Sequence, residues 1–239
     1  MARRGSEAEA QPRGASAEQI ESVARRLFAE RGVDGVTVRD IAAAAGQRNH
    51  AAVGYHFGSK EALVEEILID GAIRIDRLRN ERLDVLEAAG GPGTIGDVVQ
   101  ILIYPVLEAM AEGGGSGDYV RFVTMLGQTH REMMMRALGG RWNRGYQRCL
   151  DHLRRLMPEM PPTLANQRFV FMGAYLGSVL SLRERIHSDT AHPHPSWESD
   201  LMLRHLALTL TALLEAPAPD AAAAAAREPD EAPVPGPVG

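Results

Sequence analysis

The fold is decided by residues 37–57, which read TVRDIAAAAGQRNHAAVGYHF. Thr37 is a residue type that caps the start of a helix, and Gly46 is one that ends it. The apolar side chains between them recur at the three- and four-residue spacing of a helix, and they are Val38, Ile41, Ala42 and Ala45. Val53 and Phe57 resume this spacing after the glycine. The stretch therefore predicts two short helices around a turn, which is the layout of a helix-turn-helix.

Residues 47–60 contain no acidic side chain but hold several that suit DNA. Arg and Asn side chains can read base edges, whereas Tyr, His and Lys side chains suit phosphate oxygens. Lys60, the only lysine of the chain, also stands in the first turn of the next helix, where free backbone N–H groups favour an anion. The predicted DNA-binding residues are Thr37, Arg48, Asn49, His50, Tyr55, His56 and Lys60. The alternative is that this segment is only a polar connection between core helices.

Helical spacing of apolar residues continues on both sides of this motif. A first helix is expected from Ser16, where Ser16 and Gln19 can form a capping box, to about Gly32. Ser59 can cap a long helix that extends to about Ala89. Five further helical stretches are predicted at 94–112, 118–138, 141–157, 163–186 and 196–214. No useful run alternates as a strand does, so the predicted fold is all-α.

The chain divides into four parts by composition. Residues 1–15 are predicted to be a disordered arm, and residues 16–70 a three-helix unit that carries the helix-turn-helix and is joined by a long helix to the next part. Residues 71–215 form a larger helical bundle, and residues 216–239 a disordered tail rich in Ala, Pro and acidic residues. The net charge is −5, so binding to nucleic acid must rest on a local patch rather than on the whole molecule.

The cysteine content and the apolar runs of the sequence predict the cellular compartment. The single cysteine, Cys149, excludes an internal disulfide and a multi-thiolate metal site, and it suits a reducing cytoplasm. A membrane span needs roughly 18 apolar residues, and the run 169–182 is shorter than that. The first residues lack the apolar core of a secretory signal. We therefore expect a cytoplasmic protein without a membrane partner.

Three stretches closely resemble the TetR/AcrR family of bacterial transcriptional regulators. They are the first-helix residues Ala24, Leu27, Phe28 and Gly32, the run 37–46 and the run 55–63, YHFGSKEAL. The resemblance covers about residues 16–68 and implies an all-helical homodimer in which three N-terminal helices bind DNA. It also implies that the C-terminal bundle binds a small effector and dimerises. The segment between Gly46 and His56 is one residue longer than is usual in the family, so residues 47–52 are expected to differ locally.

The larger bundle is predicted to hold the effector pocket. Nine of the ten methionines lie between Met110 and Met202, and their flexible side chains suit an adaptable cavity, although an ordinary core is the alternative. The predicted pocket residues are Met110, Phe122, Met125, His130, Met134, Trp142 and Tyr175. Because the bundle is rich in Met, Leu and Val and poor in Lys, we expect a hydrophobic or amphipathic effector.

The stretch 163–186 is apolar on two sides, which predicts that a second subunit covers one of them. One row is Phe169, Met172, Leu176 and Leu180, and the other is Phe171, Tyr175, Leu182 and Ile186. Small residues near the first row would let a partner helix approach closely. The predicted dimer residues are Phe169, Met172, Gly173, Leu176, Gly177, Leu180, Trp197, Leu201 and Leu208. The alternative is a helix buried within one bundle.

Two further patterns leave a different class of function open. The run 91–96, GPGTIG, fits a dinucleotide-binding loop, and Glu184 with His187 and the later histidines could suggest a metal site. Because no strand precedes the glycines and a helical di-metal site needs a second Glu-x-x-His pair, we predict no cofactor and no metal. The predicted function is a ligand-responsive repressor that binds a near-palindromic operator as a homodimer and is not an enzyme. The alternative is a helical enzyme or carrier that uses the 91–96 loop or the late histidines.

Overall fold

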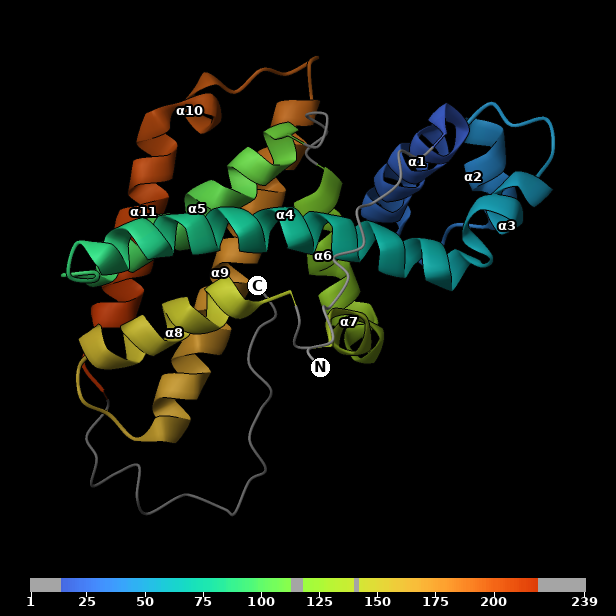
Figure 1. The fold of residues 1–239 in the computed structure, drawn as a ribbon. Coiled ribbons are helices and arrows are strands. Elements are labelled where there is room, and N and C mark those ends of the chain that lie inside the picture. Colours follow the sequence, from blue (N-terminus) through green and yellow to red (C-terminus); the bar gives the residue numbers. More distant parts are fainter. Residues whose placement is uncertain (1–13, 113–117, 140–141, 219–239) are drawn as a thin grey trace, which may run out of the picture.

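The computed structural model describes residues 14–112, 118–139 and 142–218. This part of the chain contains helices and no strand, as the sequence predicts (Figure 1). The N-terminal helices are α1 (Ala15–Arg31), α2 (Val38–Ala44), α3 (Ala51–Phe57) and the long α4 (Lys60–Ala88). They are followed by α5 (Ile95–Glu112), α6 (Asp118–Thr129), α7 (Arg131–Leu138), α8 (Arg144–Leu156), α9 (Pro162–Ser188), α10 (Pro195–Glu198) and α11 (Asp200–Glu215).

Local capping explains where two of the first four helices begin. Thr37 caps α2 in a capping box with Asp40, and the Ser59 hydroxyl accepts a hydrogen bond from the backbone N–H of Ala62 at the start of α4. The predicted box at Ser16 is wrong, because α1 begins one residue earlier, behind Gly14, and has no side-chain cap. Gly32 ends α1 with φ +73° and ψ 163°, a backbone conformation essentially restricted to glycine.

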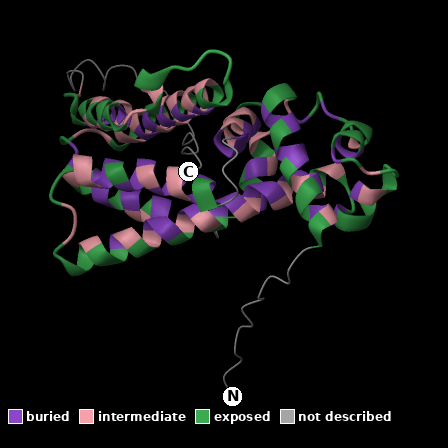
Figure 2. Cartoon of the chain, turned by 90° about the horizontal axis from the view of Figure 1, so that it is seen from above, coloured by how far each residue is buried: buried purple, intermediate pink, exposed green. Residues whose placement is uncertain are grey.

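α4 joins the two halves of the molecule. Figure 1 shows α1, α2 and α3 gathered at one end of this helix and the larger bundle along the rest of it. Buried residues recur along its length from Leu63 to Leu83, and one continuous core therefore runs from the small unit into the bundle (Figure 2).

The larger bundle departs from the predicted helices at two places. The stretch 118–138 is interrupted at His130 and forms α6 and α7, and the stretch 196–214 is interrupted at Ser199 and forms α10 and α11. The hydroxyl of Ser199 caps α11 by accepting from the backbone N–H of Met202. Both breaks lie at polar residues inside apolar patterns, where periodicity alone predicts one continuous helix.

α1 and α6 pack side by side and fix the small unit against the bundle. The rings of Phe28 and Phe122 lie 6.0 Å apart, and the guanidinium of Arg121 donates to the carbonyl of Ala29 at 3.3 Å. His130 Nε2 lies 3.1 Å from an Asp34 carboxylate oxygen at the end of this contact. Through these contacts the position of α6 directly affects that of α1, the first helix of the small unit.

Glycine permits the closest contact between α4 and α6. A Cβ on Gly71 would lie 2.1 Å from the ring of Tyr119, so only a residue without a side chain fits there. The hydroxyl of Tyr119 donates to the carbonyl of Leu68 at 2.8 Å, which satisfies this buried polar group.

α8 is held along the C-terminal half of α4 by charged side chains. Arg148 donates to the carboxylates of Asp84 at 2.7 Å and Glu87 at 2.8 Å, and His152 lies 2.8 Å from Glu87. These hydrogen bonds, first that of Arg148 and then that of His152, lower the pKa of Glu87 to about 2.

The 91–96 loop, one of the two patterns that left an enzyme or carrier open, has a structural task. In the 91–96 loop, the backbone N–H groups of Gly93 and Thr94 donate to Asp97, and Thr94 accepts from the Asp97 N–H, so the loop is a helix cap at the start of α5. Glu184 is buried whereas His187 is exposed. Within the described residues, no three His, Cys, Asp or Glu side chains gather as metal ligands. None of the described helices is long and apolar enough to cross a bilayer.

Candidate DNA-binding surface and effector cavity

α3 is fixed on one side by its apolar residues and presents its polar residues on the other. Val53 and Phe57 are buried against the core, whereas Tyr55 and His56 are exposed. A Cβ on Gly54 would meet no atom within 4 Å, so the backbone of the helix is open at this residue. This arrangement is that of a recognition helix, which has one face on its scaffold and the other free to enter a groove.

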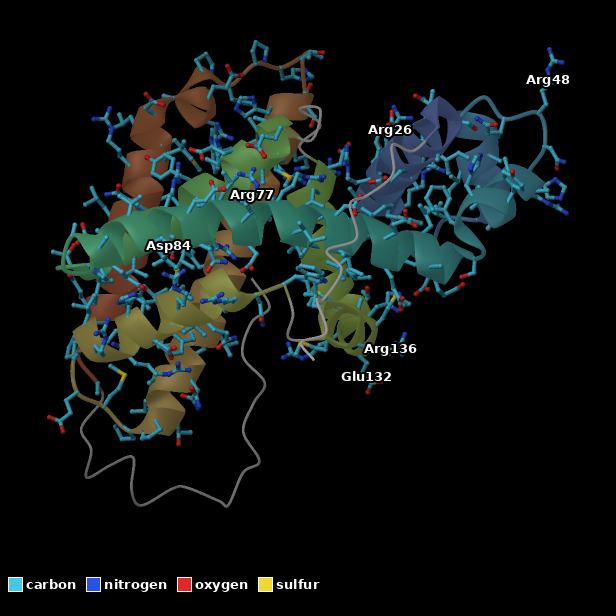
Figure 3. All side chains as sticks on the ribbon, in the orientation of Figure 1. Arg26, Arg48, Arg77, Asp84, Glu132 and Arg136 are labelled. Carbon is cyan, nitrogen blue, oxygen red and sulfur yellow. The ribbon has the colours of Figure 1, made fainter. Side chains whose placement is uncertain are left out.

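Arg48, Asn49 and His50 lie in the turn before α3 rather than in the helix, which begins at Ala51. The side-chain oxygen of Asn49 accepts the backbone N–H of Ala51 at 2.9 Å, a local bond that holds this turn. It uses the oxygen of Asn49 and not its NH2 group. Arg48 projects away from the rest of the molecule, at the end farthest from the bundle (Figure 3).

Lys60 makes two hydrogen bonds within the protein that the sequence does not predict. Its ammonium donates to the carbonyl of Val33 and to that of Val36, both at 3.1 Å. The side chain is half-buried, and it ties the connection between α1 and α2 to the start of α4. Two of the three donors of the ammonium are therefore used inside the protein.

Thr37 lies exposed at the first turn of α2, beside a residue that the sequence reasoning missed. The Thr37 hydroxyl donates to Asp40 at 2.6 Å, and this hydrogen bond lowers the pKa of the Asp40 carboxyl. Arg39, the second residue of the same helix, is also exposed. The position of Arg39 just behind the Thr37 cap was a usable sequence signal.

A cavity of about 320 Å³, which we call the central cavity, lies within the larger bundle. Its wall comes from α4, α5, α6, α7, α8 and α9, and most of the lining is apolar. Of the predicted pocket residues, Met134 lines the cavity and the others do not. The lining of α6 includes Val120, Val123, Thr124 and Gly127.

The other predicted pocket residues face elsewhere because sequence does not reveal which side of a helix meets the cavity. Phe122 and Met125 lie on the side of α6 that packs against α1, and His130 contacts Asp34. The Tyr175 hydroxyl lies 2.8 Å from that of Thr209 on α11. Met110 is buried in the core, and Trp142 packs against that core, outside the cavity lining.

The first apolar row of α9, predicted to lie in the dimer interface, packs within the subunit, and the second row includes an exposed aromatic side chain. Phe169, Met172 and Leu180 are buried within the subunit, and Met172, Gly173, Leu176, Gly177 and Leu180 line the central cavity. A Cβ on Gly177 would lie 3.3 Å from the Thr124 hydroxyl, so this glycine faces α6. Phe171, from the second row, is 58% exposed. On the next helices Trp197 is half-buried, whereas Leu201 and Leu208 are both 69% exposed.

A capped helix-turn-helix with an exposed polar face on α3, carried on a long helix that continues into a larger helical bundle, is the architecture of a DNA-binding regulator of transcription. Two family models match the chain, that of the "Bacterial regulatory proteins, tetR family" at residues 20–67 and that of the "Tetracyclin repressor-like, C-terminal domain" at residues 100–223. The protein belongs to the TetR family. Members of this family are DNA-binding regulators, so the chain is not an enzyme.

Individual proteins show the same likeness. The HTH-type transcriptional repressor KstR2 of Rhodococcus jostii (strain RHA1) is 50% identical over 50 residues, which cover 21% of this chain and 24% of that repressor. A putative tetR family transcription regulator from Shewanella sp. PV-4 has 16% identity and a TM-score of 0.52 over 84% of this chain and 97% of its own. The regulator PfmR from Thermus thermophilus has 19% identity and a TM-score of 0.50 over 82% of this chain and 96% of its own. These two structures share the fold.

Proposed function

We propose that the protein is a ligand-responsive repressor that binds a near-palindromic operator as a homodimer in the bacterial cytoplasm. The observation that carries this proposal is the exposed polar surface of the 48–50 turn and α3, at the end of the molecule farthest from the bundle (Figure 3). Repression is the activity named for the relative KstR2, with which the chain shares its 50-residue match.

In this proposal the turn reads bases and the helix positions the protein on the DNA backbone. Arg48, Asn49 and His50 contact base edges, because they are exposed and precede the helix that enters the major groove. Tyr55 and His56 bind phosphates, and Thr37 lies where the start of α2 approaches the DNA backbone. Lys60 keeps the connection between α1 and α2 in place.

The dimer in this proposal forms through the exposed apolar residues of α9 and α11. Phe171, Leu201 and Leu208 are large, apolar and open to solvent, which is costly unless a partner covers them. A two-fold axis at this surface would give a self-complementary four-helix contact. It would also present two α3 helices to half-sites about one turn of DNA, roughly 34 Å, apart.

The effector in this proposal occupies the central cavity. α6 has Val120, Val123 and Thr124 on the cavity side and Phe122 and Met125 toward the small unit. A ligand that changes the position of α6 therefore also changes how α1 packs against it. Such a ligand lowers operator affinity only if it binds the DNA-competent state more weakly than the incompetent one, and the coupling is reciprocal.

The test compares substitutions of two exposed arginines, both labelled in Figure 3. Arg48→Ala should weaken binding of the purified protein to the DNA upstream of its own gene roughly 5- to 150-fold, the equivalent of about 1–3 kcal/mol for one base contact. Arg77→Ala, on α4, removes another exposed charge far from α3 and should leave the affinity unchanged. Fluorescence anisotropy measures both, and equal affinities for the two variants would remove Arg48 from the interface.

A further inference from the structure

The wall of the central cavity contains a buried arginine. Arg79, on α4, is only 3% exposed, and its guanidinium lies 5.5 Å from the centre of the Tyr146 ring. Its terminal nitrogen donates one long hydrogen bond, of 3.4 Å, to the carbonyl of Leu102. Among the described residues, no carboxylate lies within ion-pair distance of it. A buried charge without a counter-charge costs several kcal/mol, so its presence here requires an explanation.

Two polar atoms of this wall lack a hydrogen-bond partner among the described residues. They are Nε of Arg79 and the hydroxyl oxygen of Tyr146, whose side chain is also only 3% exposed. Asp76, the acid that acts on Arg79 at longer range, already accepts from the N–H of Gly145 at 2.7 Å and from Asn80 at 3.1 Å. Since native proteins satisfy nearly all buried polar groups, two unpaired donors on one cavity wall, one of them on a cation, suit an anionic ligand.

The remainder of the cavity suits an apolar body. Its volume of about 320 Å³ has room for on the order of ten non-hydrogen atoms, at the ~30 Å³ that one water occupies in the liquid. Leu68 and Ile75 line it from α4, and Leu176 and Leu180 from α9. A ligand that satisfies both parts of the wall must have a charged end and an apolar end.

We propose that the central cavity binds an amphipathic organic anion, whose single carboxylate is held by the Arg79 guanidinium and the Tyr146 hydroxyl and whose apolar chain lies along α9. A guanidinium binds a carboxylate through charge-assisted, often paired, hydrogen bonds, and the Tyr146 hydroxyl donates a further one. The inference rests on the proposed function, because this anion would be the effector. It narrows the effector from any hydrophobic or amphipathic molecule to a carboxylate of medium length.

Three probes of equal chain length separate the contribution of the charge from that of the chain. Octanoate, octan-1-ol and octylammonium are titrated into the full-length protein by calorimetry. Octanoate should bind at least tenfold more tightly than octan-1-ol, and octylammonium should not bind. Equal binding of octanoate and octan-1-ol, binding of octylammonium, or binding of none of the three would overturn the proposal.

Variants then assign the effect to the two side chains. Arg79→Met keeps a side chain of similar length and should abolish the preference for octanoate over octan-1-ol while raising the melting temperature, because an unpaired buried charge is removed. Tyr146→Phe removes only the hydroxyl and should weaken octanoate severalfold without changing octan-1-ol. Arg77→Met, two residues along the same helix but exposed, is the matched control and should bind like the unmodified protein. An unchanged octanoate preference in both cavity variants would contradict the assignment.

The same samples separate this inference from the proposed function. If octanoate binds through Arg79 but leaves DNA affinity unchanged, the site is correct and the effector mechanism is wrong. If an uncharged compound binds and releases DNA while octanoate does not bind, the cavity is an effector site and the anion assignment is wrong.

Discussion

At the scale of single residues, Lys60 joins the segment before α2 to the start of α4. Its ammonium bonds to the carbonyls of Val33 and Val36 and so holds the segment that leads to the Thr37 cap. Lys60→Met should therefore lower the free energy of unfolding by about 1–3 kcal/mol, since it leaves two carbonyls without their charged donor. Urea denaturation measures this loss.

DNA binding by the same variant distinguishes the two roles. If Lys60 only supports the scaffold, the slope of DNA affinity against salt concentration stays as in the unmodified protein, whereas loss of a phosphate contact reduces that slope by about one counterion. Unaltered stability together with a flatter salt slope would restore the phosphate-binding role.

A second residue, Glu184, is expected to make stability depend on pH. Its side chain is buried between α9 and the first turn of α6, and burial raises its pKa from 4.5 to about 8. The backbone N–H of Arg121 donates to it at 3.3 Å, the guanidinium groups of Arg121 and Arg183 favour its charge, and the neighbouring Asp118 opposes it. The folded protein therefore keeps a proton on Glu184 at pH values where the unfolded chain has lost it.

The direction of the effect follows from this difference in bound protons. Between about pH 4.5 and 8 the native state holds more protons than the unfolded state, so stability falls as pH rises through this window. The fall is at most about 1.4 kcal/mol per pH unit. Glu184→Gln should flatten it, as measured by urea denaturation between about pH 5.5 and 8.5, a range that brackets the folded-state pKa. Parallel curves for the variant and the unmodified protein would show that Glu184 does not titrate there.

At the scale of elements, α6 is the wall that the small unit and the central cavity share. Its fit on α4 depends on Gly71, where any side chain meets the Tyr119 ring. Gly71→Ala should displace Tyr119 and its hydrogen bond to Leu68, at a cost of about 1–3 kcal/mol for overpacking.

The control for this change is another helical glycine. Gly54→Ala adds the same methyl group where no atom lies within 4 Å, and it should stabilise the protein by roughly 0.5–1 kcal/mol through helix propensity. Thermal unfolding compares the two variants. A Gly71→Ala protein as stable as the Gly54→Ala protein would show that Tyr119 is not held as described.

For the helices, the sequence predicts local features but not which side of each helix faces the cavity. The caps at Thr37 and Ser59 and the spacing of Val53 and Phe57 depend on neighbours within a few residues, so they were predictable. α6 and α9 are apolar on more than one side, and only tertiary packing decides which side meets the cavity. Arg79 was missed because an arginine in a charged helix such as α4 gives no local signal of burial.

At the scale of the whole molecule, the proposed dimer places a partner subunit on α9 and α11. Leu201→Glu combined with Leu208→Glu should convert the proposed dimer to a monomer, because charges cannot be buried in an apolar interface without partners. Val85→Glu is the matched control, since Val85 on α4 is 73% exposed but lies outside the proposed interface.

Sedimentation velocity at micromolar concentration measures both variants. A double variant that remains dimeric would show that α11 does not form the interface. A Val85→Glu protein that becomes monomeric would place the interface on the C-terminal half of α4 instead.

Selection of binding sites from a random-sequence duplex library by the full-length protein tests whether the 48–50 turn and α3 read DNA. We expect enrichment of an inverted repeat, with half-sites about one DNA turn apart, and loss of that enrichment in the combined Arg48→Ala and Tyr55→Ala variant. Val85→Glu should enrich the same repeat as the unmodified protein. Enrichment of the same sequence by the Arg48 and Tyr55 variant, or of no sequence by the unmodified protein, would contradict the assignment of the turn and α3 as the DNA-reading surface.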